Sequence, residues 1–133
     1  MAEIRFVNLP GAVPPRGYSD AALVSGGRRL VLGGHVAFDD QRRIVAPGDL
    51  LAQLRQTLRN LRGTLQAAGF TPADLVKLKL HVTDVAAYQT QLKAIGTIWQ
   101  EELGPVYPAM ILVGVTGLFE AGSVIEIDGE AVH

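Results

Sequence analysis

The 133-residue chain contains no cysteine, and this absence excludes disulfides, thiolate catalysis and cysteine-ligated metal sites. An excess of charge of one sign is also missing, because 12 basic and 13 acidic residues give a formal net charge of −1. A general nucleic-acid or anionic-membrane binder is more often clearly basic. The three histidines, His35, His81 and His133, share no ligand-like spacing, so neither a metal site nor a cofactor is predicted.

Long hydrophobic runs are scarce as well. The uncharged stretch from Pro105 to Phe119 is too short and too rich in glycine and proline to span a membrane. The first fifteen residues lack the continuous apolar segment of a signal peptide. We therefore expect a cytoplasmic protein without a membrane partner. A hydrophobic content of 48% over this length predicts one compact domain, residues 1–133.

The hydrophobic pattern changes period along the chain. Apolar residues alternate in strand-like runs, and leucines recur at spacings of four and three where helices are expected. The predicted order is three strands, a helix, a strand, a helix and two strands. Strands are expected at residues 4–7, 21–24, 30–38, 74–84, 107–115 and 123–132, and helices at 49–68 and 84–103.

This order predicts an α+β domain in which two helices cover one face of a sheet. The other face is expected to be half apolar and half charged. In the last strand, for example, Ile125 and Ile127 alternate with Glu126 and Asp128. Another copy of the chain is the simplest cover for such a face.

Several segments of the sequence carry a pattern of residues specific enough to compare with known families. The chain carries "RGYSDAALVSGGRRLVLGGHVAFDD", "PGDLLAQLRQTLRNLRGTLQAAGFTPADLVKLKLHVTDVAAY" and "YPAMILVGV" followed by "GSVIEIDGEAV". Their order and spacing resemble the YjgF/RidA family over nearly the whole chain. The resemblance implies a chorismate-mutase-like fold, with a mixed sheet and two helices on one face. It also implies a homotrimer with small-molecule clefts between subunits. The best-known members of this family hydrolyse enamines and imines made from amino acids, releasing ammonia and a 2-oxo acid.

The sequence departs from this family at the ligand positions. Deaminating members begin the strand equivalent to residues 107–115 with Pro-Ala-Arg, and their arginine binds the substrate carboxylate through a bidentate pairing. Here the tripeptide is Pro108-Ala109-Met110, and a thioether carries no charge and donates no hydrogen bond. An unpaired carboxylate in a partly buried cleft costs several kcal/mol, on the order expected for lone buried charges.

Two further positions differ. The family's usual Ser-Gly-Gln or Ala-Gly-Gln reads Gly33-Gly34-His35, and Leu92 stands where some members have asparagine. The resemblance makes Gly33, Gly34, Ala109 and Leu92 candidate ligand-binding positions alongside Met110.

Two family residues are retained, namely Tyr18 and Glu126. The resemblance implies that Glu126 positions a hydrolytic water and that Tyr18 forms a cleft wall and donates a hydrogen bond. His35 is a candidate ligand contact or proton carrier, because imidazole titrates near neutrality. Either His35 or Arg16 could supply the missing positive charge.

Each of these residues also has a purely structural interpretation. Met110 could fill a gap in the core, His35 could be a satisfied structural histidine, and Glu126 could belong to a charged surface with Asp128 and Glu130. Two function classes therefore stay open. The first is a hydrolase of an imine, an enamine or a related reactive metabolite, for which typical 2-imino-acid deamination is doubtful. The second is a non-catalytic trimer that binds a metabolite or regulates a partner enzyme.

Endoribonuclease activity, with which some family members have been labelled, is a weaker alternative. Arg55, Arg59 and Arg62 form a stripe on the first helix, but such a stripe is usually the solvated side of an amphipathic helix. No aromatic platform for stacking bases accompanies it. A nucleic-acid partner is therefore not predicted.

Overall fold

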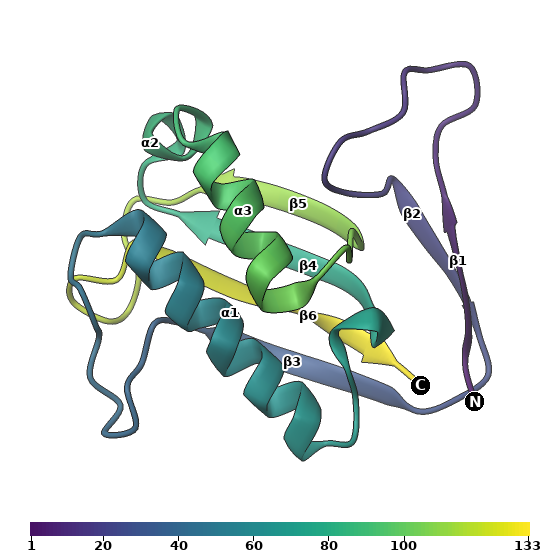
Figure 1. Cartoon of the computed structure of the whole chain (residues 1–133), viewed down its shortest axis with the longest axis horizontal. Helices are drawn as coiled ribbons and strands as arrows, with labels where there is room; N and C mark the ends of the chain where they lie inside the picture. Colours follow the sequence, from purple (N-terminus) through teal and green to yellow (C-terminus); the bar gives the residue numbers. More distant parts are fainter.

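The computed structural model describes all 133 residues, in a four-stranded mixed sheet, a separate two-stranded hairpin and helices on one face of the larger sheet (Figure 1). The larger sheet has the strand order β3-β6-β4-β5, in which only β4 and β5 are parallel. The strands are β1 (Glu3–Val7), β2 (Ala21–Ser25), β3 (Arg29–His35), β4 (Leu75–Val82), β5 (Ala109–Gly114) and β6 (Ile125–Val132), and the helices are α1 (Leu50–Ala67), the 3-10 turn η1 (Pro72–Asp74), α2 (Val85–Gln89) and α3 (Leu92–Leu103). The predicted α+β class is confirmed, and so is the element order except that the second predicted helix is divided in two.

Helix α1 begins and ends where the sequence indicates. Asp49 caps its N-terminus by accepting a hydrogen bond from the Ala52 amide at 3.1 Å. Gly69 follows the helix with φ of +81°, a conformation that glycine adopts without strain. The predicted leucine stripe faces the sheet, and its four central members are fully buried: Leu54, Leu58, Leu61 and Leu65.

The two faces of the larger sheet differ as predicted. On β4, Leu78, Leu80 and Val82 are buried beneath α1 and α3. The residues between them, Lys77, Lys79 and His81, lie on the opposite face and pair in register with Glu130, Asp128 and Glu126 of β6. Apolar Val31 and Ile111 flank these charged rows and are 66% and 46% exposed. We call this helix-free surface the open face.

The second predicted helix is interrupted. It forms α2 and α3, separated by Thr90 and Gln91. The side chains of both residues donate to the Ala87 carbonyl, at 3.1 and 2.9 Å. Side chains that bond to nearby carbonyls compete with the helical ladder, and the chain restarts as α3 at Leu92.

Strand β3 is shorter than predicted, because it ends at His35 and does not reach Phe38. The Asn60 side-chain amide of α1 donates to the carbonyls of Val36 and Phe38, at 3.0 and 2.9 Å. These carbonyls therefore bond to a helix side chain and not to a neighbouring strand.

The hairpin β1-β2 lies apart from the four-stranded sheet and runs past one end of it (Figure 1). Its strands pair only with each other, from Glu3 opposite Ser25 to Val7 opposite Ala21. The loop between them returns to the larger sheet at Ser19, which bridges to Ala109 at the start of β5. No helix of the structure is long and apolar enough to cross a membrane.

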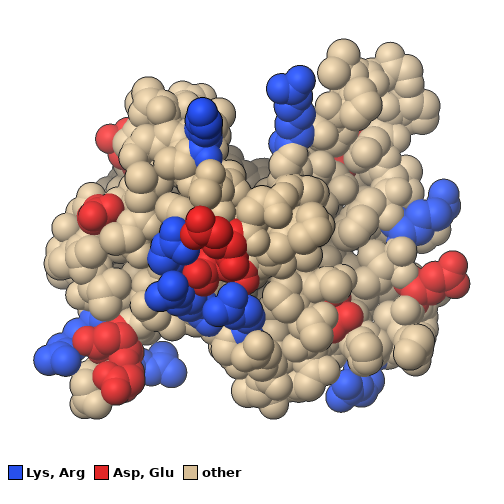
Figure 2. Space-filling model, in the orientation of Figure 1, with Lys and Arg blue, Asp and Glu red and all other residues tan.

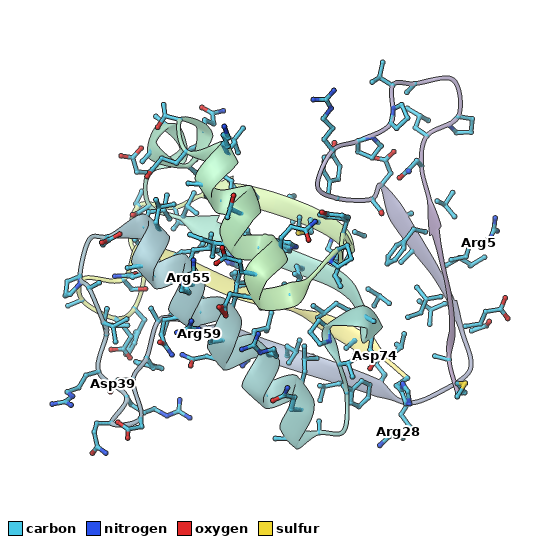
Figure 3. All side chains as sticks on the ribbon, viewed as in Figure 1. Arg5, Arg28, Asp39, Arg55, Arg59 and Asp74 are labelled. Atoms are coloured by element: carbon cyan, nitrogen blue, oxygen red, sulfur yellow. The ribbon has the colours of Figure 1, made fainter.

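The arginine stripe of α1 forms ion pairs, contrary to the interpretation of a freely solvated surface. Figure 2 shows acidic side chains surrounded by basic ones at the centre of the helical face, and Figure 3 places Arg55 and Arg59 where α1 passes α3. Glu102 of α3 is only 6% exposed. Arg59 Nε lies 3.0 Å from its carboxylate, Arg55 Nη1 lies 3.2 Å away, and Arg62 Nη1 donates to its backbone carbonyl at 2.7 Å.

Candidate functional site: an aromatic-lined cavity

A cavity of about 730 Å³ lies between α3, the edge strand β5 and the loop that precedes β2. Ten of its thirteen lining residues are hydrophobic. A volume of this size falls within the usual range for small-molecule sites, which are mostly apolar with a few polar groups. The lining residues are Arg16, Gly17, Tyr18, Leu80, Tyr88, Leu92, Ile95, Gly96, Trp99, Tyr107, Met110, Ile111 and Leu112.

Backbone bonds hold the loop before β2 against this cavity. Ser19 donates its amide to the Pro108 carbonyl at 3.0 Å and its hydroxyl to the Tyr107 carbonyl at 2.8 Å. Gly17 has φ of +78°, so the chain turns there in a conformation that glycine favours. Arg16 and Tyr18 are thereby placed at the edge of β5, more than 85 residues away in sequence.

Helix α3 forms the opposite wall through residues one turn apart. Leu92, Gly96 and Trp99 lie at spacings of four and three, which place them on one helix face. Trp99 donates its indole N–H to the Val106 carbonyl at 2.8 Å, which fixes the ring. A Cβ added to Gly96 would meet no atom within 4 Å, so this glycine leaves open space in the wall.

Few polar groups reach the cavity. Arg16 forms no salt bridge or hydrogen bond within the chain, and the hydroxyls of Tyr18 and Tyr88 bond to no other residue. Burial raises the pKa of Tyr88 above the ordinary tyrosine value. Its phenol therefore stays protonated near neutral pH and can donate a hydrogen bond. The Tyr107 hydroxyl accepts a hydrogen bond from Gln100 Nε2 at 2.7 Å.

The structure brings together four of the residues predicted from the sequence. Arg16, Tyr18, Leu92 and Met110 come from three segments of the chain and line the same cavity. Met110 pairs in register with the buried Leu78, so its side chain faces the helix layer. Ala109 is buried beside it at the start of β5.

Glu126 lies on the other side of the sheet. It pairs with His81 on the open face, where its side chain forms no ion pair or hydrogen bond within the chain. Gly34 lies directly beneath its carboxylate, and a Cβ at Gly34 would overlap Glu126 Oε2. Gly33 lies next to it, at an irregularity in the β3–β6 register. Within a single chain, Glu126 therefore does not reach the cavity.

His35 is also separate from the cavity, because it packs against α1. Its Nδ1 lies 2.8 Å from the Gly33 carbonyl, and its Nε2 lies 2.8 Å from the Thr64 hydroxyl. A carbonyl only accepts, so Nδ1 carries a hydrogen and donates it to Gly33, whereas the Thr64 hydroxyl also lies 3.2 Å from the Asn60 carbonyl, to which it donates. Both ring nitrogens thus have partners inside the subunit.

Sequence reasoning missed three aromatic residues of the site. Tyr88 and Trp99 fall in the helix predicted at residues 84–103, at the spacing of core residues, and Tyr107 falls at the start of a predicted strand, so the sequence indicates none of them as part of a site. A glycine in mid-helix at position 96, one turn from both Leu92 and Trp99, is the signal that could have indicated a cavity. No group of three or more histidine, aspartate or glutamate residues is close enough to hold a metal ion.

Comparison with known proteins identifies relatives along the whole chain. A family model described as Endoribonuclease L-PSP matches residues 11–133. A RutC family protein of Pyrococcus horikoshii is 29% identical over 119 residues, covering 89% of this chain and 88% of the relative. The human 2-iminobutanoate/2-iminopropanoate deaminase is 28% identical over 130 residues, covering 98% and 88%. A Rid-family protein of unknown function from Yersinia pestis is 34% identical, with a TM-score of 0.87 and 98% coverage of both chains.

Proposed function

The chain belongs to the Rid family, whose sequence model is described as Endoribonuclease L-PSP, and on this premise we propose that it hydrolyses an imine or enamine in clefts between the subunits of a homotrimer. The observation that carries this proposal is the convergence of Tyr18, Leu92 and Met110 on one cavity. The family resemblance implies that Tyr18 forms a cleft wall and that Leu92 and Met110 are ligand-binding positions. Relatives named as 2-iminobutanoate/2-iminopropanoate deaminases support the reaction class.

A second copy of the chain is needed to complete the site. The cavity opens beside β5, whereas Glu126 and Gly34 lie on the open face. Packing of the open face against a neighbouring subunit would bring the Glu126 of one copy to the cavity of another. The exposed apolar side chains of Val31 and Ile111 on this face support such an interface.

The proposed chemistry needs no cofactor. Glu126 holds a water molecule and accepts its proton while the oxygen adds to the C=N carbon. Glu126 returns that proton to the nitrogen, which gives a neutral carbinolamine. The hydroxyl proton of the carbinolamine then passes through Glu126 to the nitrogen as the C–N bond breaks, so ammonia and a carbonyl product leave. Tyr18 donates a hydrogen bond to the bound ligand, and backbone N–H groups around Met110 bind its carbonyl oxygen.

Met110 limits the substrates that this site takes. Its uncharged side chain faces the cavity where deaminating members have an arginine. Short 2-imino acids, which offer little besides their carboxylate, should therefore bind poorly. His35 is bonded to α1 and does not replace that charge, whereas Arg16 lines the cavity and has no partner in the chain.

A non-catalytic trimer that binds a metabolite or regulates a partner enzyme is the second candidate function. It is favoured by the uncharged Met110 at the position of the family's carboxylate-binding arginine, in a cavity that is still present. The endoribonuclease activity in the family description is supported less well, because Glu101 and Glu102 pair with the arginines of α1 that would form a basic surface.

Turnover and binding assays on Glu126→Ala distinguish the two functions. A dehydratase would generate 2-iminobutanoate in the presence of a trapping nucleophile, and release of 2-oxobutanoate would be followed. Hydrolysis that is lost in Glu126→Ala supports the enzyme. Saturable ligand binding without turnover, unchanged in Glu126→Ala, supports the binding protein.

A further inference from the structure

Every tyrosine and the only tryptophan of the chain line one cavity. These residues are Tyr18, Tyr88, Tyr107 and Trp99, which come from the loop before β2, from α2, from the segment before β5 and from α3. None of the four phenylalanines lines it. Tyrosine and tryptophan combine a large apolar ring with a polar atom, so they suit sites that hold a ring and also orient it.

The rest of the cavity wall is aliphatic and partly empty. Leu80, Ile95 and Leu112 supply its floor, and Gly96 leaves a space that any side chain would narrow. A ligand of three or four carbons has too little apolar surface to use such walls. A phenyl ring removes much more apolar surface from water, and it can also meet the aromatic residues edge to face.

One positive charge accompanies these walls. Arg16 is the sole charged residue that lines the cavity, and it is exposed, so it lies at the mouth. It forms no salt bridge, unlike Arg29, Arg43, Arg55, Arg59 and Arg62. A guanidinium in this position can bind a carboxylate through two parallel hydrogen bonds while the rest of the ligand is buried.

We propose that the cavity binds an aromatic monocarboxylate, with its ring among the aromatic side chains and its carboxylate on Arg16. The reacting group of the substrate rests on the proposed function, because imine hydrolysis makes the corresponding substrate a 2-imino-3-arylpropanoate. Hydrolysis of 2-imino-3-phenylpropanoate consumes one water and yields ammonia and 2-oxo-3-phenylpropanoate. The ligand class itself is independent of turnover, because stable acids without an imine have the same ring and carboxylate.

Trp99 provides a direct binding signal, because it is the only tryptophan and lines the cavity. Its fluorescence would be titrated with 3-phenylpropanoate, butanoate and 3-phenylpropanamide. We expect 3-phenylpropanoate to bind at least tenfold more tightly than butanoate, which lacks the ring. It should also bind at least tenfold more tightly than 3-phenylpropanamide, which lacks the charge. Equal affinity for 3-phenylpropanoate and butanoate, or no saturable signal with any of the three, would overturn the inference.

Matched variants locate the binding. Gly96→Leu fills the open part of the wall and should weaken 3-phenylpropanoate binding at least tenfold. Gly63→Leu makes the same exchange on α1, where a Cβ also meets no atom within 4 Å, and should leave binding unchanged. Arg16→Gln should weaken binding of the acid but not of the amide, while Arg5→Gln on the outer side of β1 (Figure 3) should change neither. An unaffected Gly96→Leu would contradict the assignment.

Turnover then separates this inference from the proposed function. An amino-acid oxidase would generate the imines of phenylalanine and 2-aminobutanoate under the same trapping conditions. Faster hydrolysis of the phenylalanine imine supports both the enzymatic function and the proposed ligand class. Tight binding of 3-phenylpropanoate with no hydrolysis of either imine rejects the enzymatic function and keeps the ligand class. Equal or faster hydrolysis of the 2-aminobutanoate imine would support the enzymatic function and reject the proposed ligand class.

Discussion

At the scale of single residues, Glu102 contributes most clearly to stability. Burial opposes its ionisation, but the hydrogen bonds and charges of Arg59, Arg55 and Arg62 outweigh this effect and hold the pKa of Glu102 below its ordinary value. The carboxylate is nearly inaccessible, whereas its arginine partners are partly exposed. Removing the carboxylate would leave three like charges together on α1.

Glu102→Gln should destabilise the fold by about 1–3 kcal/mol near pH 7, as expected when buried charged partners lose their hydrogen bonds. Because the folded-state pKa is lowered, the stabilisation is complete above the unfolded-state pKa and is lost as the pH falls through the folded-state value. Urea unfolding of wild type and variant at a series of pH values measures the difference in their free energies of unfolding. The difference from wild type should shrink below about pH 4.5, the ordinary value for this group.

Glu101→Gln is the matched control for this experiment. Glu101 also pairs with Arg55, at 2.7 Å, but its side chain is 52% exposed, and exposed ion pairs contribute little. A loss of stability as large as that of Glu102→Gln, or a difference that does not depend on pH, would contradict the proposed role of Glu102.

Gly34 tests whether the position of Glu126 matters. In Gly34→Ala the new Cβ would displace the Glu126 carboxylate, which is the far end of a flexible side chain. Stability should therefore change by less than about 1 kcal/mol, as is common when a substitution disturbs no core packing. Imine hydrolysis should fall at least tenfold, because the water would lose its correct position.

Gly63→Ala serves as the control for Gly34→Ala, because its Cβ meets nothing. Combining Gly34→Ala with Glu126→Ala should add no further loss of turnover. If Gly34→Ala hydrolyses imines at the wild-type rate, Glu126 does not position the water.

At the scale of elements, local signals in the sequence predict most of the fold. Asp49 and Asp84, the first residues of the two predicted helices, cap α1 and α2, and the alternation in β4 and β6 matches their burial. The misplaced boundaries have one physical cause. Side-chain bonds to backbone carbonyls, from Asn60, Thr90 and Gln91, end a strand and interrupt a helix. The hydrophobic periodicity of the sequence does not reveal such bonds.

Gln53 connects α1 to the loops at one end of the sheet, although it is completely buried. Its Nε2 donates to the carbonyls of Ala46 and Gly122, at 3.1 and 2.8 Å, and its Oε1 accepts from the Val124 amide at 2.9 Å. Gln53→Leu would leave these backbone groups unpaired, at a cost of about 1–3 kcal/mol. Thermal unfolding measures it, and Gln66→Leu, on the exposed side of the same helix, should have little effect. A neutral Gln53→Leu would show that these loops do not depend on this side chain.

At the scale of the whole molecule, the cavity could be predicted only in part. Family resemblance indicated Tyr18, Leu92 and Met110, since these match motif positions. The aromatic walls depend on how α3 packs beside β5 and on the Ser19 bonds that bring distant loop residues there. No local pattern in the sequence reports such contacts. The alternation in the last strand places Glu126 on the face away from the helices, but its pairing with His81 follows only from strand register.

The open face should hold copies of the chain together. Light scattering should give three times the chain mass of 14.2 kDa. Val31→Lys places a positive charge on this face, opposite Glu130 of the same chain. Because the two side chains can form an ion pair, the fold should persist while the trimer weakens. Gln66→Lys, on the exposed side of α1, should leave the mass unchanged. A monomeric wild-type protein would contradict every site between subunits.

The proposed substrate range depends most on Met110, which stands where the family resemblance implies a carboxylate-binding arginine, and one measurement tests this directly. Hydrolysis of 2-iminobutanoate would be compared between wild type and Met110→Arg in the trapping assay, with thermal unfolding to confirm that both are folded. We predict slow hydrolysis by the wild type and at least a tenfold increase in kcat/KM for the variant, since a charged hydrogen bond is worth about 1.5–3 kcal/mol. Rapid hydrolysis by the wild type, with no gain in Met110→Arg, would contradict the account.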